Sequence, residues 1–218
     1  FSIDPASPGI VLRTSLADPA KKGRASVKEV YESVLADAEK AASLMTKSRG
    51  VQYASQEAAW SLLARVNLYK EDNSKAIEYA DKVIGSGKYT LSSTTTYPTL
   101  FANATASSET IFCIAFTQVD DYGKFGSIAS MIYSDGNSGW GEEYASSSLR
   151  NLMTKHPEDV RWSYIVPLKT GAGQVQKKNG IEVYYISKFS FQDGLPNLSS
   201  PIMFRLAELY LIRAEAKA

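Results

Sequence analysis

Residues 56–87 read QEAAWSLLARVNLYKEDNSKAIEYADKVIGSG, and this stretch decides the fold class. Apolar side chains recur at helical spacing in residues 56–70 and again in residues 74–84, which predicts two amphipathic helices. The short polar turn Glu71-Asp72-Asn73 separates them, and Gly85 and Gly87 fit a glycine-terminated helix end. The pattern helix, short turn, helix predicts an αα-hairpin.

This hairpin has part of the spacing of a tetratricopeptide repeat. Trp60-x-x-Leu63-Ala64 is followed by Ala76-x-x-x-Ala80, and such small residues let the second helix lie close to the first. Asn67 stands where the repeat prefers Tyr, and Ala80 stands where it prefers Phe. A generic αα-hairpin is therefore the alternative interpretation.

The segments before and after the hairpin differ in character. Residues 1–25 are rich in Pro and Gly, which is typical of loops, and a capping box of Ser26 and Glu29 opens a predicted helix that runs to Met45. Residues 202–218 have apolar side chains at helical spacing again and predict a further helix. The predicted buried stripe of that helix comprises Met203, Leu206, Ala207, Tyr210, Leu211 and Ala214. Tyr31, Tyr69 and Tyr210 fall on such helix stripes and are expected to be structural.

Between these helical parts the chain is rich in Ser, Thr, Gly, Asn and aromatic residues. The apolar run of residues 110–116 predicts a short buried strand, and residues 146–154 predict a helix. Asn179-Gly180 predicts a type I′ turn between strands at residues 173–178 and 181–191. In the second of these strands one face is expected to hold Ile181, Val183, Tyr185 and Phe189.

Composition excludes several classes of protein. The 218 residues are 44% apolar and 22% charged with a net charge of +1, which excludes low-complexity disorder. The 24 basic and 23 acidic residues give no electrostatic case for nucleic acid or for anionic lipid. A single Cys and a single His exclude a disulfide framework and a His/Cys metal site. No apolar run is long enough to span a membrane.

Several motifs together, in this order along the chain, resemble a known family. They include SETIF at residues 108–112, Gly139-Trp140-Gly141, EDVR at residues 158–161 and PIMFRLAELYLIRAEA at residues 201–216. With residues 23–42 and the hairpin that ends in Lys88-Tyr89-Thr90-Leu91, they closely resemble the SusD/RagB family of Bacteroidetes outer-membrane nutrient-binding lipoproteins. The resemblance extends over essentially the whole chain, and residues 201–216 are its most specific part.

The resemblance implies a mainly α fold. Tetratricopeptide-like helix pairs would form the scaffold, with an irregular, loop-rich insertion that contains short β-hairpins. Residues 1–218 are then expected to be a single SusD-like domain, with a helical scaffold at 26–85, the insertion at 86–200 and the start of a further helix pair at 201–218. The domain is expected to be truncated at both ends, with a lipobox Cys upstream of the first residue and more helices after the last.

The resemblance also implies a function. Family members capture glycans or peptides at the cell surface, are tethered to the outer membrane by a lipidated Cys, and deliver the ligand to a TonB-dependent SusC-like transporter. They are not enzymes, and no cofactor is expected. We therefore expect non-catalytic glycan binding. The alternatives are a binder of peptides and a helical-repeat module for protein–protein interaction.

The candidate ligand-binding residues follow from composition and not from the family. A sugar ring stacks its C–H face on an aromatic ring, while its hydroxyls need nearby amides and carboxylates. Residues 122–144 offer that mixture in a loop-rich segment. The candidates are Trp140, Tyr133, Tyr122, Asn137 and Tyr144. The alternative is that Trp140 and Tyr144 pack the insertion, and the glycines on both sides of Trp140 suit either role because they allow close backbone approach.

Other possible chemistries have simpler explanations. Asp120-Asp121 and Asp135-x-Asn137-x-Gly139 fit turn chemistry better than a Ca²⁺ loop. Glu142 and Glu143 are adjacent, so they cannot flank a glycosidic bond as a catalytic pair. We expect His156 in a solvated loop, Cys113 as an inert core thiol and Arg161 in a structural ion pair with Asp159. The sequence thus predicts no catalytic residue and no metal site.

Overall fold

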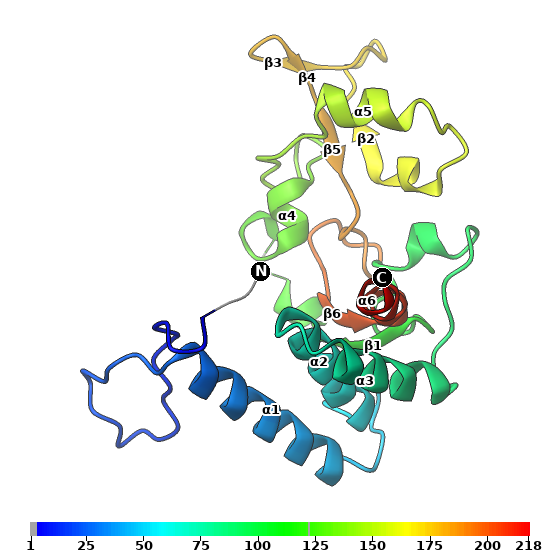
Figure 1. The fold of residues 1–218 in the computed structure, drawn as a ribbon. Helices are drawn as coiled ribbons and strands as arrows, with labels where there is room; N and C mark the ends of the chain where they lie inside the picture. Colours follow the sequence, from blue (N-terminus) through cyan, green and yellow to red (C-terminus); the bar gives the residue numbers. More distant parts are fainter. Residues whose placement is uncertain (1–3, 122) are drawn as a thin grey trace. The chain divides into compact units, whose positions relative to one another are not determined.

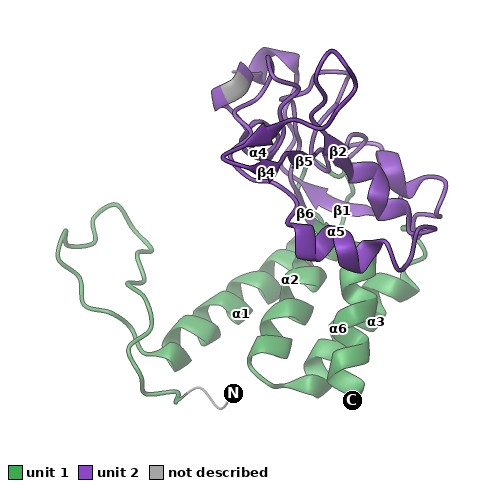
Figure 2. Ribbon diagram, turned by 90° about the horizontal axis from the view of Figure 1, so that it is seen from above, with its two compact units in different colours: residues 1–89, 204–218 green, residues 90–203 purple. Residues whose placement is uncertain are grey.

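The computed structural model describes residues 4–121 and 123–218. Helices make up 38% of the chain, and the strands are few and short. Two compact units form, which Figure 2 shows in different colours. The first unit contains the chain up to Tyr89 together with Phe204–Ala218, and the second contains Thr90–Met203. The predicted mainly α character is confirmed.

Four helices form the first unit (Figure 1): α1 at Val27–Leu44, α2 at Gln56–Tyr69, α3 at Asn73–Gly85 and α6 at Leu206–Lys217. Polar N-caps start the first three. The predicted capping box of Ser26 and Glu29 opens α1, while the side chains of Ser55 and Asp72 cap α2 and α3. The helices that the sequence predicts before residue 86 are therefore confirmed to within a residue or two at each end.

Helices α2 and α3 pack on each other, and small residues of both are buried. Ala64, Ala76 and Ala80 have no exposed surface, and neither has Leu63. Asn67 is also buried, and its amide donates a hydrogen bond of 2.8 Å to the Leu63 carbonyl, one turn back along the helix. Helix α1 packs on α2, and α6 packs mainly on α3. The first unit is thus a helical layer built on the αα-hairpin.

The prediction of a helix from residue 202 is wrong for its first four residues. Ile202–Arg205 form a strand, β6, and α6 begins only at Leu206. The chain before β6 is already engaged in backbone pairing, since the Pro201 carbonyl accepts a hydrogen bond of 3.0 Å from the Ile114 N–H. Arg205 is still extended, with φ −138° and ψ 154°. A β-branched and an aromatic residue in this stretch suit a strand.

The predicted buried stripe of this last helix is wrong except for Leu206, which is buried as expected. The face that is buried consists of Leu206, Leu209, Ile212 and Ala216, whereas Leu211 is 67% exposed and Tyr210 is 37% exposed. Apolar residues occur around most of the helix, so periodicity allows more than one stripe, and packing on α3 decides between them. Tyr69 on α2 is likewise 68% exposed, against the prediction that it is structural.

The second unit consists of loops and short elements. Its helices are α4 at Ile128–Ile132 and α5 at Ser147–Met153, and its strands are β1 at Thr110–Cys113, β2 at Ile165–Pro167, β3 at Lys177–Lys178, β4 at Ile181–Glu182 and β5 at Tyr184–Ile186. Single turns of 3₁₀-helix lie at Tyr97–Thr99, Gln118–Asp120, Gly123–Phe125 and Val160–Tyr164. The predicted strand at 110–116 and helix at 146–154 are confirmed in shorter form.

The predicted hairpin is present and has the predicted turn. Asn179 and Gly180 both have positive φ, 51° and 79°, and they join β3 to β4 in the antiparallel register Lys178↔Ile181. The strands are shorter than predicted. Ile181 is 61% exposed, so the expected buried face begins at Val183. Strand β5 then pairs with β2 in the register Ile165↔Ile186.

Aromatic side chains hold the second unit together in two small cores. One core contains Tyr133, Leu168, Val183 and Tyr185, and the other contains Leu100, Phe101 and Tyr164 with Tyr97 and Phe189 against it. The rings meet edge to face, as Phe101 and Phe189 do with centroids 5.3 Å apart. Much of the high tyrosine content therefore serves packing.

Within the residues that the structure describes, no helix combines the length and the apolar character that crossing a lipid bilayer requires.

Candidate functional site

Two exposed aromatic side chains lie side by side in the second unit. Phe125 is 69% exposed and Trp140 is 47% exposed, and their ring centroids are 5.0 Å apart with an interplanar angle of 56°. Large apolar side chains that remain in water in a contiguous group are typical of binding surfaces. We call Phe125 and Trp140 the aromatic platform.

Backbone hydrogen bonds to α4 hold Trp140 in place. The N–H groups of Trp140 and Gly141 both donate to the Ser130 carbonyl, at 2.6 and 3.1 Å, and the Glu142 N–H donates to the Met131 carbonyl at 2.8 Å. The indole Nε1 donates to the carboxylate of Glu142. A carboxylate therefore lies at the edge of the platform, where its other lone pairs can accept hydrogen bonds.

The glycines on both sides of Trp140 are required for this arrangement. Gly139 has φ +77°, and a Cβ there would lie 2.1 Å from the Tyr133 carbonyl oxygen. Gly141 has φ +63°, and a Cβ there would lie 2.5 Å from the ring of Tyr185. Both positions therefore need a residue that has no side chain and tolerates positive φ. The predicted close backbone approach at these glycines is confirmed.

The other predicted ligand residues do not join the platform. Tyr133 and Tyr144 instead meet the buried ring of Tyr185 edge to face, at centroid distances of 6.3 and 5.5 Å. Tyr133 is only 6% exposed, although it borders an open groove of about 540 Å³ that Phe191 and Ser190 also line. These contacts favour the packing role for both tyrosines.

Asn137 and Tyr122 complete the set of predicted residues. Asn137 is exposed in the turn before Trp140, and its N–H donates to the Asp135 carboxylate at 2.8 Å. Tyr122 lies outside the residues that the structure describes. Of the four predicted residues that the structure describes, Trp140 and Asn137 are the two that are exposed, and they lie in the same loop.

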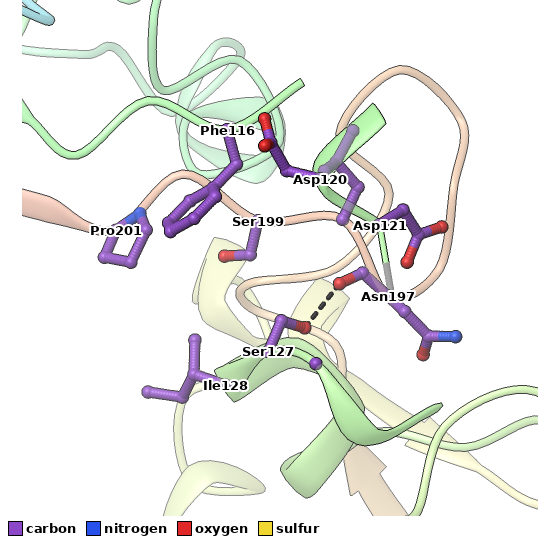
Figure 3. A pocket seen from close by; sticks show the side chains of 10 residues that line it. Phe116, Asp120, Asp121, Ser127, Ile128, Asn197, Ser199 and Pro201 are labelled. Atoms are coloured by element: carbon purple, nitrogen blue, oxygen red, sulfur yellow. Dashed lines mark hydrogen bonds between the residues drawn. The ribbon is translucent and has the colours of Figure 1, made fainter. Parts of the chain in front are cut away.

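A pocket of about 200 Å³ lies at α4, the helix that also supports the platform (Figure 3). We call it the Ser199 pocket. It combines apolar and polar walls. They come from the chain around the 3₁₀ turn Gln118–Asp120, from the start of α4 and from the chain that leads to β6. Its lining residues are Phe116, Asp120, Asp121, Gly126, Ser127, Ile128, Asn197, Leu198, Ser199 and Pro201.

Two polar atoms at this pocket have no hydrogen-bond partner among the described residues, namely Ser199 Oγ and Asn197 Oδ1. Ser199 is 3% exposed and Asn197 is 9% exposed. By contrast Ser127 Oγ donates to the Asn197 carbonyl, the bond drawn in Figure 3. Sequence reasoning missed this pocket. The polar run Asn197-Leu198-Ser199-Ser200 was the available signal, and it resembles ordinary loop chemistry.

The aspartates of this region are held in turns, as predicted. Asp120 accepts hydrogen bonds from the N–H and the hydroxyl of Thr117 at 2.8 and 2.9 Å, and these bonds lower its pKa. Asp135 accepts from the N–H groups of Ser138 and Asn137 at 2.6 and 2.8 Å, and these bonds lower its pKa in the same way. Both side chains are therefore carboxylates at neutral pH.

Three further residues lie where the sequence predicts them. Cys113 is fully buried, and burial raises the pKa of its thiol. His156 is exposed, with Nδ1 3.3 Å from Glu158 Oε1. Arg161 Nε lies 2.9 Å from both carboxylate oxygens of Asp159 and lowers the pKa of that group to about 2.

Metal-ligating residues do not cluster in the described part of the chain. No group of three or more His, Cys, Asp and Glu side chains there is placed to hold a metal ion.

No family model matches the sequence, and no curated protein matches it. Solved structures do match. A SusD superfamily protein from Bacteroides thetaiotaomicron superposes with a TM-score of 0.81 and 29% identity, over 97% of this chain and 48% of that one. A SusD superfamily protein from Bacteroides vulgatus gives a TM-score of 0.79 and 28% identity, over 97% and 47%.

A laminarin binding SusD-like protein has the same fold, with a TM-score of 0.73 at 24% identity, over 95% of this chain and 54% of that one. The chain thus spans about half the length of the structures that it matches. The resemblance found in the sequence is confirmed by these structures, and the chain is SusD-like over nearly all of its residues.

Proposed function

We propose that this chain binds glycans without catalysing a reaction on them. The aromatic platform is the observation that supports this most directly, because two adjacent exposed rings offer a sugar chain a surface for its C–H faces. The Glu142 carboxylate beside Trp140 then supplies an acceptor for sugar hydroxyls. Asn137, exposed in the same loop, is the proposed additional polar contact.

The solved relatives support glycan binding in general terms. Structures that superpose on nearly all of this chain are SusD-like, and one of them is named for binding laminarin. That name describes the other protein. It makes laminarin the first ligand to test on this chain.

The charge states of the nearby carboxyl groups support binding over hydrolysis. A glycosidase needs one carboxyl group with a raised pKa as a general acid, placed across the bond from a second one. In this region the pKa of Asp120 and that of Asp135 are both lowered by hydrogen bonds to the charged form. Glu142 is engaged by the indole of Trp140.

The finer parts of the proposal rest on the family resemblance. They are that residues 1–218 belong to a single SusD-like domain, that its helix pairs are tetratricopeptide-like, and that the parent protein is lipid-anchored at the cell surface. The ligand would then pass to a SusC-like TonB-dependent transporter. Copurification of the parent protein with such a transporter from outer membranes tests the last step.

Isothermal titration against a panel of neutral polysaccharides, laminarin included, tests glycan binding. We expect Trp140→Ala to weaken binding by about tenfold or more, because a stacked aromatic side chain at the centre of an interface contributes about 2 kcal/mol or more. Tyr69→Ala is the matched control, since Tyr69 is also an exposed aromatic residue and belongs to α2 in the other unit.

Two outcomes would contradict the proposal. One is binding of peptides with no binding of any glycan, and the other is release of shorter products when the pure protein is incubated with its ligand. Thermal unfolding of Trp140→Ala should match the unsubstituted protein, which separates lost binding from lost folding.

A further inference from the structure

We infer that the Ser199 pocket is a subsite for one sugar unit that is uncharged or positively charged, and that it rejects uronic acids. This inference rests on the proposed glycan binding and adds a selectivity to it. The size of the pocket, its unpartnered polar atom, its apolar wall and its charge all favour such an occupant.

The size of the pocket limits its occupant. Its volume is about 200 Å³. Pockets that enclose drug-sized ligands run from about 300 to 1,000 Å³, so this one is too small for an oligosaccharide. A single ring, or one edge of a ring, is what fits.

The wall of the pocket includes a polar group, the Ser199 hydroxyl, that lacks a hydrogen-bond partner among the described residues. Ser199 is 3% exposed. In Figure 3 this hydroxyl points toward the space between Pro201 and Ile128. A buried polar group without a partner destabilises the protein, and a ligand that supplies one recovers that cost. A hydroxyl can both donate and accept, which matches the hydroxyl groups of a sugar.

The opposite wall is apolar. Phe116 is 40% exposed and Ile128 is 46% exposed, and both line the pocket together with Pro201. An apolar wall across from a hydroxyl is the combination that a sugar ring needs, because one face of the ring consists of C–H groups and its edge consists of hydroxyls.

The charge of the pocket sets its selectivity. Asp120 and Asp121 both line it, and none of the lining residues that the structure describes is basic. Hydrogen bonds from Thr117 keep Asp120 in its charged form. A carboxylate on the sugar would therefore meet two negative charges without a compensating cation among the described lining residues, whereas an amino group would be attracted.

The pocket lies beside the loop that contains Trp140. Asn197 lines the pocket, and its Oδ1 lies 3.3 Å from the position where a side chain at Gly139, next to Trp140, would begin. Ile128 in the pocket and Ser130, which binds the Trp140 backbone, both belong to α4. A glycan that lies on the platform can therefore place a neighbouring unit in the pocket.

The test uses three small probes and the whole chain. Methyl β-glucoside, the methyl glycoside of glucosamine and that of glucuronic acid differ mainly in charge. NMR titration of each should give dissociation constants for the first two that are about tenfold lower than for the glucuronide at low salt. The difference between these dissociation constants should become smaller as salt is added, because screening weakens charge repulsion.

Asp121→Asn supplies the matched variant, because the amide oxygen can still accept the hydrogen bond of 2.8 Å from the Gly123 N–H. We expect glucuronide binding to improve severalfold in this variant and to stay unchanged in the control Asp193→Asn, which removes an exposed carboxylate that does not line the pocket. Equal affinity for glucoside and glucuronide, a gap that Asp121→Asn leaves unchanged, or no binding of any of the three would overturn the inference.

These outcomes are separate from the fate of the proposed function. If polysaccharide binding depends on Trp140 but the three probes show no discrimination by charge, glycan binding stands and the pocket inference fails. If no polysaccharide binds at all, the proposed function itself fails.

Discussion

Gly139 and Gly141 show how much depends on single residues at the platform. Both have positive φ, and each lies against a neighbour that leaves no room for a side chain. The two glycines let the loop run tightly over α4, so that the Trp140 ring faces outward. Without them the backbone could not bind the Ser130 carbonyl as it does.

Gly141→Ala should therefore destabilise the protein and weaken glycan binding together. Ala at positive φ costs about 1–2 kcal/mol, and the overlap with the Tyr185 ring adds about 1–3 kcal/mol. Gly173→Ala is the control, because Gly173 has φ +78° with no atom within 4 Å of the added Cβ. Urea unfolding measures the loss of stability in the two variants. Equal losses would show that the contact with Tyr185 is unimportant.

The site was only partly predictable at this scale. Trp140 could be identified because it is a large aromatic between two glycines in a polar loop. Ser199 and Asn197 could not, because nothing in their local sequence shows that their oxygen atoms are left without partners. Phe125 was also not among the predicted ligand residues, since its pairing with Trp140 depends on how the loop at residues 123–125 turns.

Among the elements, α3 has a cluster of charged side chains whose contribution to stability depends on pH. Glu78 lies between Lys75 and Lys82 on the helix surface, with a distance of 2.7 Å to each ammonium group. Hydrogen bonds from these two lysines lower the pKa of Glu78 from 4.5 to about 2. The folded state therefore favours the carboxylate, and this stabilisation is present above pH 4.5 and is lost as the pH falls toward 2.

We expect Glu78→Gln to lower the free energy of unfolding at pH 7 by about 0.5 kcal/mol, a value reduced by solvent screening of these exposed groups. The difference from the unsubstituted protein should shrink between pH 4.5 and 3 in urea unfolding. Glu32→Gln is the control and should have a smaller effect, because the Lys28–Glu32 pair is longer, at 3.8 Å, and more exposed. A difference that is constant with pH would contradict this assignment.

The elements also show where sequence patterns suffice. Helices α1, α2 and α3 were predictable, because polar caps and a clear apolar face agree in each of them. Helix α6 has apolar residues on most sides, so its start and its buried face depend on tertiary packing. Residues 202–205 were mistaken for helix because a strand in this stretch needs a pairing partner far away in sequence.

At the scale of the whole molecule, the first unit is closed by contacts between distant parts of the chain. Arg65 on α2 forms a bidentate pair with Glu208 on α6, at 2.6 and 2.8 Å. The same guanidinium lies over the ring of Phe204, 4.2 Å from its centroid. A planar, stacked and bidentate arginine cannot be replaced by lysine without loss.

Arg65→Ala should therefore lower the free energy of unfolding by about 1–3 kcal/mol, because it leaves a partly buried Glu208 without its main partner. Arg213→Ala is the control. It breaks the more exposed pair with Asp81 and should cost less than about 1 kcal/mol. Similar losses of unfolding free energy in both variants would show that the contacts of Arg65 do not specifically stabilise the packing of α6.

The first unit is built from two separate stretches of sequence, one that ends at Tyr89 and one that begins at Phe204, so the ribosome makes its parts at different times. A ribosome adds roughly 5–20 residues per second. Helices α1 to α3 are therefore complete several seconds before α6 exists, since residues 90–203 must be made in between. During this interval the face of α3 that α6 will cover lacks its partner helix. The nascent chain must either be shielded there or wait with that apolar surface exposed.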